Sequence, residues 1–132
     1  MRIMLDTNIL ISAFVLGGKI EKLLDLIYDE GYSVYVTEYV DLEFRRVVNK
    51  KFSSRKEEIF AKYAKRKFKI YPSTTQILGK VRDEKDIPVL SDAIFHEVDI
   101  LLTGDKDFLE SEIKNPLIMS PVILFEYLNQ NS

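Results

Sequence analysis

Apolar and polar positions follow two alternating patterns along the chain. Short runs of apolar, aromatic or β-branched residues predict buried strands, and they lie at residues 2–5, 32–36, 68–71, 100–103 and 117–119. Between them, apolar residues recur at helical spacing, which predicts helices at residues 19–30, about 37–48, about 53–64, from 86 onward, and 121–128. This alternation predicts an α/β fold with a mainly parallel sheet that helices cover on both faces.

Polar residues mark where several of these helices begin. Thr37 is suited to cap the helix after the second strand, and Ser53 or Ser54 is suited to cap the next one. Asp86, followed by Pro88, has the cap and first-turn residues of another helix start. We therefore expect these side chains to accept hydrogen bonds from the first N–H groups of their helices.

One carboxylate interrupts the apolar beginning of the chain. Asp6 follows residues 2–5 directly and so stands at the carboxyl end of the first predicted strand. A buried, ionised carboxylate without partners costs several kcal/mol. Asp6 therefore either caps a helix that begins at Thr7 and Asn8, or faces a polar site at the edge of the sheet.

Further acids fall near the same edge. In open parallel sheets, ligands bind beyond the carboxyl ends of the strands. Asp105 and Asp107 follow the strand at 100–103, Asp86 starts a helix, and Glu43 lies beside the apolar stripe of the helix after the second strand. Each acid alone is explained as a helix cap or a surface residue. Together they would repel one another, and a divalent cation such as Mg²⁺ or Mn²⁺ would resolve this.

Composition narrows the class of protein and of metal site. With 132 residues, 46% of them hydrophobic and 30% charged, the sequence predicts a single domain spanning residues 1–132. No apolar run reaches membrane-spanning length and no secretory leader is recognisable, so we expect a cytoplasmic protein. Without cysteine, and with His96 as its single histidine, the chain must hold any metal through oxygen.

The net charge of −2 hides an uneven distribution. Residues 44–70, called the basic arm below, contain eleven Lys and Arg residues against two acids. The simple explanation is a pair of solvated helices. The alternative, which we favour, is a nucleic-acid-binding surface, because such clusters neutralise phosphates and release counterions. The basic residues that follow Glu43 on the same helix are the best candidates, and they are Arg45, Arg46, Lys50 and Lys51.

Four short motifs occur in an order that resembles a known family. They are LDTN at 5–8, DLEF at 41–44, RDEKDIPVLSDA at 82–93 and TGDKDF at 103–108. In this order and spacing they resemble the PIN-domain ribonucleases, most closely the VapC-type toxins of toxin–antitoxin pairs. The resemblance covers essentially the whole chain.

This resemblance implies a three-layer α/β/α PIN-like fold and a metal-dependent endoribonuclease that uses Mg²⁺ or Mn²⁺ to activate water. It implies an acidic quartet of Asp6, Glu43, Asp86 and Asp105, with Asp107 as a further metal ligand. Asn8 and Thr103 match polar positions that orient the acids. One position departs from the pattern, because the family often has a small residue where Asp92 stands. We expect Asp92 to be an accessory surface acid or to perturb the helix packing.

Two other functions remain open. A haloacid-dehalogenase-like phosphatase also begins with an apolar strand that ends in Asp, but it needs a second Asp two residues later, where this chain has Asn8. A non-catalytic nucleic-acid-binding protein or scaffold could keep the same fold, although the full acidic set argues against it.

The resemblance also implies partners. RNA would be the substrate. An antitoxin protein could cover the acidic edge, for instance by inserting an Arg among the carboxylates. PIN proteins often form homodimers, for which an exposed apolar helix at Val122 to Leu128 could serve. We expect Tyr28, Tyr32 and Tyr39 to be packing residues and not platforms for base stacking.

Overall fold

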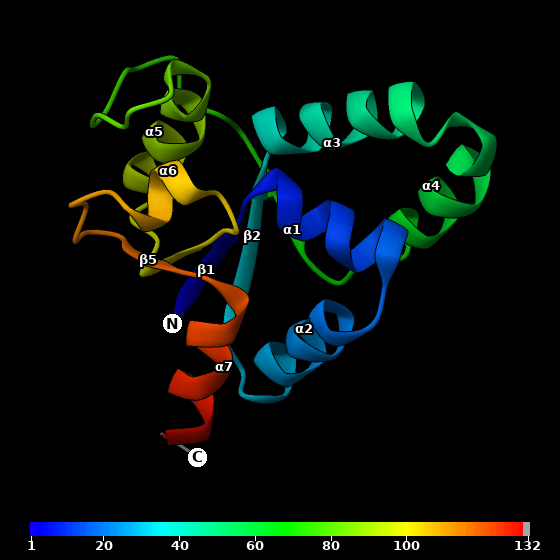
Figure 1. Cartoon of the computed structure of the whole chain (residues 1–132), viewed down its shortest axis with the longest axis horizontal. Coiled ribbons are helices and arrows are strands. Elements are labelled where there is room, and N and C mark those ends of the chain that lie inside the picture. Colours follow the sequence, from blue (N-terminus) through cyan, green and yellow to red (C-terminus); the bar gives the residue numbers. More distant parts are fainter. Residues whose placement is uncertain (131–132) are drawn as a thin grey trace.

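The strands form one parallel sheet (Figure 1). In the computed structural model, which describes residues 1–130, five strands lie in the order β3-β2-β1-β4-β5, and each neighbouring pair is parallel. The strands are β1 Arg2–Leu5, β2 Ser33–Thr37, β3 Lys69–Tyr71, β4 Ile100–Leu102 and β5 Leu117–Met119. The predicted parallel sheet is confirmed.

β1 occupies the centre of the sheet because its side chains are apolar on both faces. Residues 3–5 of β1 and 100–102 of β4 are completely buried. Beyond these strands the N–H of Asp6 donates to the carbonyl of Leu102 at 3.0 Å. The carboxyl ends of β1 and β4 therefore lie side by side.

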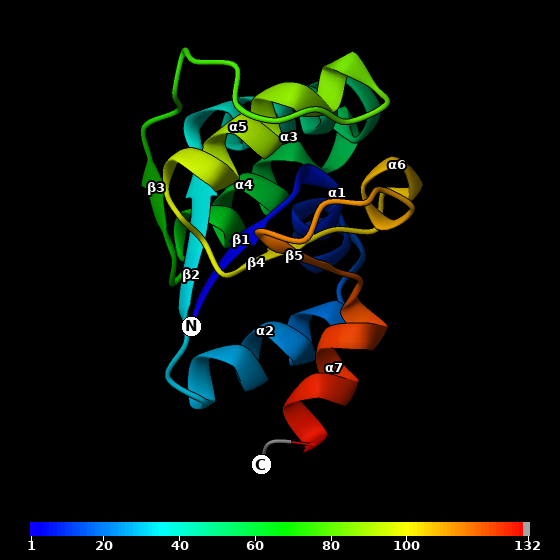
Figure 2. The ribbon, with the colours of Figure 1, turned by 90° about the vertical axis from the view of Figure 1, so that its left-hand side faces the viewer.

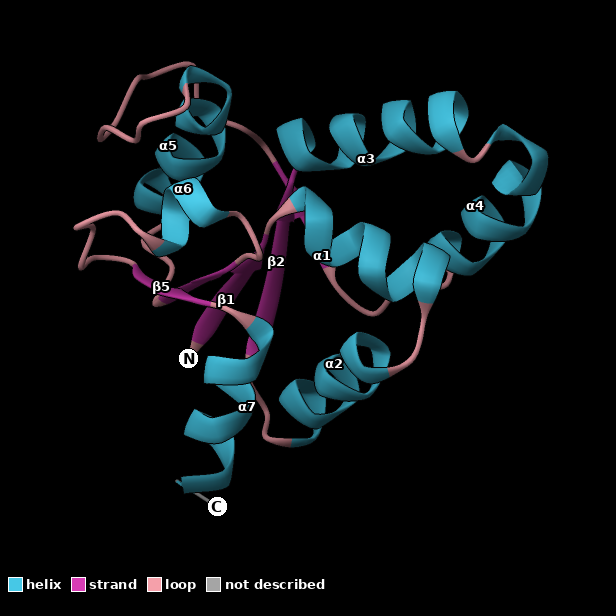
Figure 3. Ribbon diagram, viewed as in Figure 1, coloured by secondary structure: helices cyan, strands magenta, loops and turns pink. Residues whose placement is uncertain are grey.

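Helices cover both faces of the sheet. Within residues 1–130 they are α1 Thr7–Ile11, α2 Lys19–Asp29, α3 Glu38–Lys51, α4 Lys56–Ala64, α5 Ile87–Phe95, α6 Lys106–Leu109 and α7 Pro121–Gln130. Figure 3 shows α5 and α6 on one side of the strands and α1 to α4 on the other. α7 follows β5 and lies beside α2 (Figure 2). The three-layer α/β/α architecture is thus confirmed.

The basic arm is anchored to the first helix. α1 continues into a π-helical turn at Ser12–Leu16. Arg55 donates to the carbonyl of Val15 at 3.3 Å, and the Nζ of Lys62 donates to the carbonyl of Ala13 at 3.4 Å. The carbonyls of this wide turn therefore receive cationic donors from the arm, and two of its basic residues have a structural role.

Aromatic residues fill the space between the arm and the sheet. The ring of Phe14, from the π-helical turn, packs edge-on against Phe44, Tyr63 and Phe68 at centroid distances of 6.1, 5.1 and 6.1 Å. This aromatic cluster buries the apolar side of α3 and α4, so the arm packs as part of the domain core.

The helix caps predicted at Thr37 and at Ser53 or Ser54 are wrong. Thr37 occupies the position before α3, but its Oγ1 is buried without a hydrogen-bond partner among the described residues. The N–H of Tyr39 donates instead to Ser73 Oγ at 2.9 Å, from a distant loop. Ser53 and Ser54 lie in a 3₁₀ turn before α4 and provide no side-chain cap. At α3 a tertiary contact therefore replaces the predicted local cap, and α4 begins without a side-chain cap.

None of the helices within residues 1–130 combines the length and the apolar character needed to cross a bilayer.

Candidate active site

Asp6 is held in one orientation at the end of β1. Its side chain is only about 5% exposed. Oδ1 accepts from the N–H of Thr7 at 2.8 Å, which caps α1, and Oδ2 accepts from Thr103 Oγ1 at 2.7 Å. Burial, with smaller contributions from the charges of Glu43 and Asp105, raises its pKa to about 6, although both hydrogen bonds act to lower it. Asp6 is therefore both a cap and a member of an acidic cluster.

The loops after β1 and β4 are fastened to each other. Thr103 Oγ1, which donates to Asp6, also accepts from the N–H of Asp105 at 3.0 Å. Across the same edge, Asn8 Oδ1 accepts from the N–H of Gly104 at 3.1 Å. Asn8 and Thr103 were predicted to orient the acids, and a residue in that role would make contacts of this kind.

Asp86 has the most perturbed carboxyl group at this edge. It stands before α5, as expected, but its side chain makes no capping hydrogen bond. Its Oδ2 is buried and has no partner among the described residues. Burial is the first cause that raises its pKa to about 8, and the adjacent Asp105 is the second. The simple explanation of Asp86 as a helix cap is therefore wrong.

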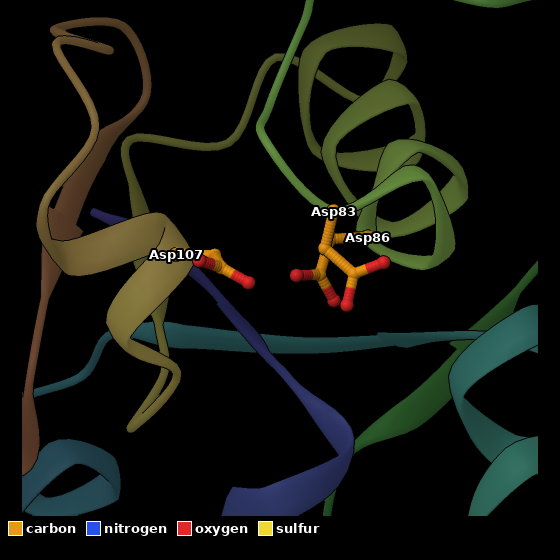
Figure 4. Close-up of side chains that lie close together, drawn as sticks. All are labelled: Asp83, Asp86 and Asp107. Atoms are coloured by element: carbon orange, nitrogen blue, oxygen red, sulfur yellow. The ribbon is translucent and has the colours of Figure 1, made fainter.

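A third acid near Asp86 was not predicted as a site residue. Carboxylate oxygens of Asp83, Asp86 and Asp107 lie within 4.8 Å of one another, and Figure 4 shows Asp107 pointing from α6 across a gap toward the other two. Asp83 precedes the 3₁₀ turn Glu84–Asp86 and accepts from the N–H of Lys85 at 3.0 Å. The spacing of the two acids in RDEKD was the signal available in the sequence.

Glu43 approaches the cluster from the opposite side. It lies on α3, its carboxylate contacts the guanidinium of Arg46 at 3.7 Å, and its charge raises the pKa of Asp6. Tyr39, one turn earlier, has its pKa raised first by burial and then by the charge of Glu43, with smaller contributions from Asp86 and Asp6. Tyr39 therefore borders the acids and is more than a packing residue.

The four predicted acids come from four different segments of the chain and lie close enough for the charges of Glu43 and Asp105 to act on Asp6 and that of Asp105 on Asp86. Among residues 1–130, however, the acids whose carboxylate oxygens all lie within 4.8 Å of one another are Asp83, Asp86 and Asp107. Sequence comparison now decides the family: the family model described as PIN domain matches residues 2–107. The chain belongs to the PIN domain family. This membership supports a nuclease, and the matched segment includes every predicted acid.

One solved structure has a fold similar to that of this PIN domain. Its title reads "Crystal structure of VapBC2 from Rickettsia felis bound to a DNA fragment from their promoter". The TM-score is 0.72 with 18% sequence identity, and the alignment covers 91% of this chain and 98% of that chain. At this identity the similarity establishes a shared fold. Comparison with curated protein sequences gives no significant match.

Asp92, the departure from the family pattern, is not a surface acid. It is only 1% exposed on α5. Its Oδ2 accepts from Ser73 Oγ at 2.7 Å and its Oδ1 from the N–H of Thr74 at 2.8 Å. Because the same Ser73 hydroxyl accepts from the N–H of Tyr39, Asp92 links α5 to the first turn of α3. In this PIN domain the acid supports the helix that carries Glu43.

The four basic candidates have different surroundings. Arg45 Nε donates to both oxygens of Asp41 at 3.1 Å, and its guanidinium lies over the rings of Phe60 and Tyr63 at 5.8 and 5.3 Å. Arg46 is largely exposed apart from its contact with Glu43. The exposed Lys50 and Lys51, at the end of α3, form no ion pair within residues 1–130. Nucleic-acid binding by these residues stays a prediction.

Proposed function

We propose that this PIN domain is a metal-dependent endoribonuclease and the toxin of a toxin–antitoxin pair. The observation that carries the proposal is the electrostatic coupling of the acids beyond the carboxyl ends of the central strands: the charge of Asp105 acts on Asp6, and the charges of Asp105 and Asp6 act on Asp86. Burial first, and then the charges of neighbouring acids, raise the pKa of Asp6 to about 6 and of Asp86 to about 8. Buried carboxylates without a cationic partner are costly for a fold, because a paired or solvent-exposed carboxylate requires less free energy. Carboxyl groups with such raised pKa values are common at functional sites.

The donor set fits a divalent cation. The acids offer carboxylate oxygens, which Mg²⁺ and Mn²⁺ prefer, and the buried Oδ2 of Asp86 has no partner among the described residues. We assign the role of metal ligand to Asp6, Glu43, Asp86, Asp105 and Asp107. We add Asp83, because its carboxylate lies within 4.8 Å of those of Asp86 and Asp107. When bound, the ion would supply charge neutralisation and a lower pKa for an attacking water.

The other residues of the site act by positioning. Thr7 and Thr103 fix both oxygens of Asp6, so the carboxylate cannot rotate away from the cluster. Asn8 holds the backbone of Gly104 and thereby the loop that presents Asp105 and Asp107. We propose that the exposed Lys50 and Lys51 of the basic arm attract the RNA strand.

The similarity in fold supports the proposed biological role. The similar structure from Rickettsia felis is a VapBC2 complex, which supports an antitoxin partner for this chain. We propose that the antitoxin covers the acidic edge and that the chain forms a homodimer. Val122, Ile123 and Phe125 on α7 are 67%, 51% and 50% exposed, and they offer an apolar surface for such contacts.

One experiment separates the candidate functions. Purified protein is incubated with labelled single-stranded RNA in Mn²⁺ or in EDTA. The nuclease predicts shortened RNA in Mn²⁺ and intact RNA in EDTA. Release of inorganic phosphate from phosphate esters would identify a phosphatase. Binding without any chemical change would identify a scaffold. Either of these two results would overturn the proposal.

A further inference from the structure

Arg82 places a cation directly beside the acidic cluster. It precedes Asp83 in the long loop between β3 and α5. Its Nε donates to Asp107 Oδ1 at 2.7 Å, and its Nη2 donates to Glu110 Oε2 at 3.2 Å. Two carboxylates on α6 and just after it therefore fix the guanidinium at the edge of the cluster.

These two contacts leave part of the guanidinium unused. The group carries five N–H donors in one plane, and within residues 1–130 the Nη1 atom makes no hydrogen bond or ion pair. The side chain is 67% exposed. An exposed pair of this kind adds little to the stability of a fold, so replacing Arg82 should leave the protein folded.

The surroundings of Arg82 form a shallow hollow beside the acids. The hollow has a volume of about 340 Å³, and its lining includes two cations, Lys80 and Arg82, three acids, Asp107, Glu110 and Glu112, and the hydroxyl of Ser111. Lys80 adds a second positive charge, and Ser111 adds a hydroxyl. Asp107 belongs at once to this hollow and to the cluster of Asp83 and Asp86. The hollow is therefore continuous with the proposed cleavage site.

We propose that Arg82 binds a backbone phosphate of the RNA strand next to the one that is cut. This inference rests on the proposed function. A planar guanidinium can give two parallel hydrogen bonds to a phosphate, and a group already fixed by two acids loses little freedom when it binds. Arg82 is thus a substrate-binding residue on the α6 side of the acids, opposite the basic residues of α3.

A competing explanation is that Arg82 only screens the negative charge of Asp107 and Glu110. Both explanations predict weaker RNA binding by Arg82→Gln. They differ for the double variant Arg82→Gln/Glu110→Gln, which removes one positive and one negative charge and so keeps the net charge of the hollow. Screening predicts that this double variant recovers wild-type affinity, whereas a direct phosphate contact predicts that it stays weak.

The test measures two quantities. Fluorescence anisotropy of labelled single-stranded RNA gives the Kd of binding in EDTA, where no strand is cut. Cleavage assays in Mn²⁺ give KM. Arg82→Gln should raise Kd and KM roughly tenfold, the size of one lost charge-assisted contact. The double variant should remain as weak, and Glu110→Gln alone should bind at least as well as the wild type. Lys22→Gln on α2, which removes one exposed charge elsewhere, is the matched control and should bind like the wild type.

Two outcomes overturn the inference while the nuclease stands: wild-type Kd and KM for Arg82→Gln, or recovery of wild-type affinity by the double variant. If the wild type leaves RNA intact in Mn²⁺, the proposed function fails and the inference fails with it. Melting curves of each variant show that the compared proteins are folded.

Discussion

At the scale of single residues, the site depends on a buried acid outside it. Asp92 accepts two hydrogen bonds and connects through Ser73 to the first turn of α3. Asp92→Ala should lower the free energy of unfolding by about 2–4 kcal/mol, because half-buried donors on Ser73 and Thr74 lose their buried acceptor. Urea denaturation of both proteins measures this difference. An unchanged midpoint would mean that the network carries no stability.

The raised carboxyl pKa values predict an unusual pH dependence of the metal-free protein. The folded state keeps protons on Asp6 and Asp86 up to pH values of about 6 and 8, whereas the unfolded chain releases them near 3.8. Folding therefore takes up protons in this window, and stability rises as the pH falls from 8 toward 4. In EDTA, Tm should be higher at pH 5.5 than at pH 8. Asp86→Asn should reduce that rise, and an equal rise in the variant would contradict this assignment.

Some site residues were predictable from the sequence and others were not. Asp6 and Asp105 follow apolar strands directly, so the topology of a parallel sheet brings them together. Asp83 and Arg82 lie in a long loop without periodicity, where the sequence does not indicate which way a side chain points. Asp92 was misjudged for another reason: its partners, Ser73 and Thr74, come from that same loop and leave no local pattern.

At the scale of elements, the basic arm combines structural and exposed cations. Lys50 and Lys51 end α3 without ion pairs among the described residues, so replacing both with Gln should weaken RNA binding and leave Tm unchanged. The log–log salt slope should become shallower by about 1.4, at roughly 0.7 for each lost phosphate contact on a single strand. Binding at four salt concentrations measures the slope. A wild-type slope would show that these lysines only face solvent.

Arg45 should behave differently from its neighbours on α3. Its guanidinium bonds to Asp41 and lies over Tyr63, which itself donates to Asp41 at 2.8 Å. Arg45→Gln should therefore lower Tm, because Asp41 loses its cationic partner. Lys50→Gln should leave Tm unchanged. Thermal unfolding of the two single variants compares them. A loss of RNA affinity with unchanged Tm would instead make Arg45 a binding residue.

The start of α3 shows why a capping residue is hard to predict from the local sequence. Thr37 is well placed in the sequence to cap α3, yet Ser73 accepts the N–H of Tyr39. The existence of α3 followed from its apolar spacing, whereas its capping depends on a loop that passes nearby only in the folded chain.

At the scale of the whole molecule, one topology explains both the fold and the site. Parallel strands place Asp6 and Asp105 at one edge, and the helices that follow bring Glu43, Asp86 and Asp107 to it. A cation bound by these acids should stabilise the folded state alone. Mn²⁺ at roughly 100 times its Kd should add about 2.7 kcal/mol to the free energy of unfolding. A Tm unaffected by Mn²⁺ would contradict the metal site.

The most direct test of the central claim is RNA cleavage by Asp6→Asn in Mn²⁺. The amide keeps the shape of the carboxylate and its acceptor oxygen for Thr7, so the fold should be retained. Cleavage should fall at least about 100-fold, because the charge that holds the cation is lost. Asp29→Asn, at the exposed end of α2, is the matched control and should cleave like the wild type. Undiminished, Mn²⁺-dependent cleavage by folded Asp6→Asn would show that the active site is elsewhere.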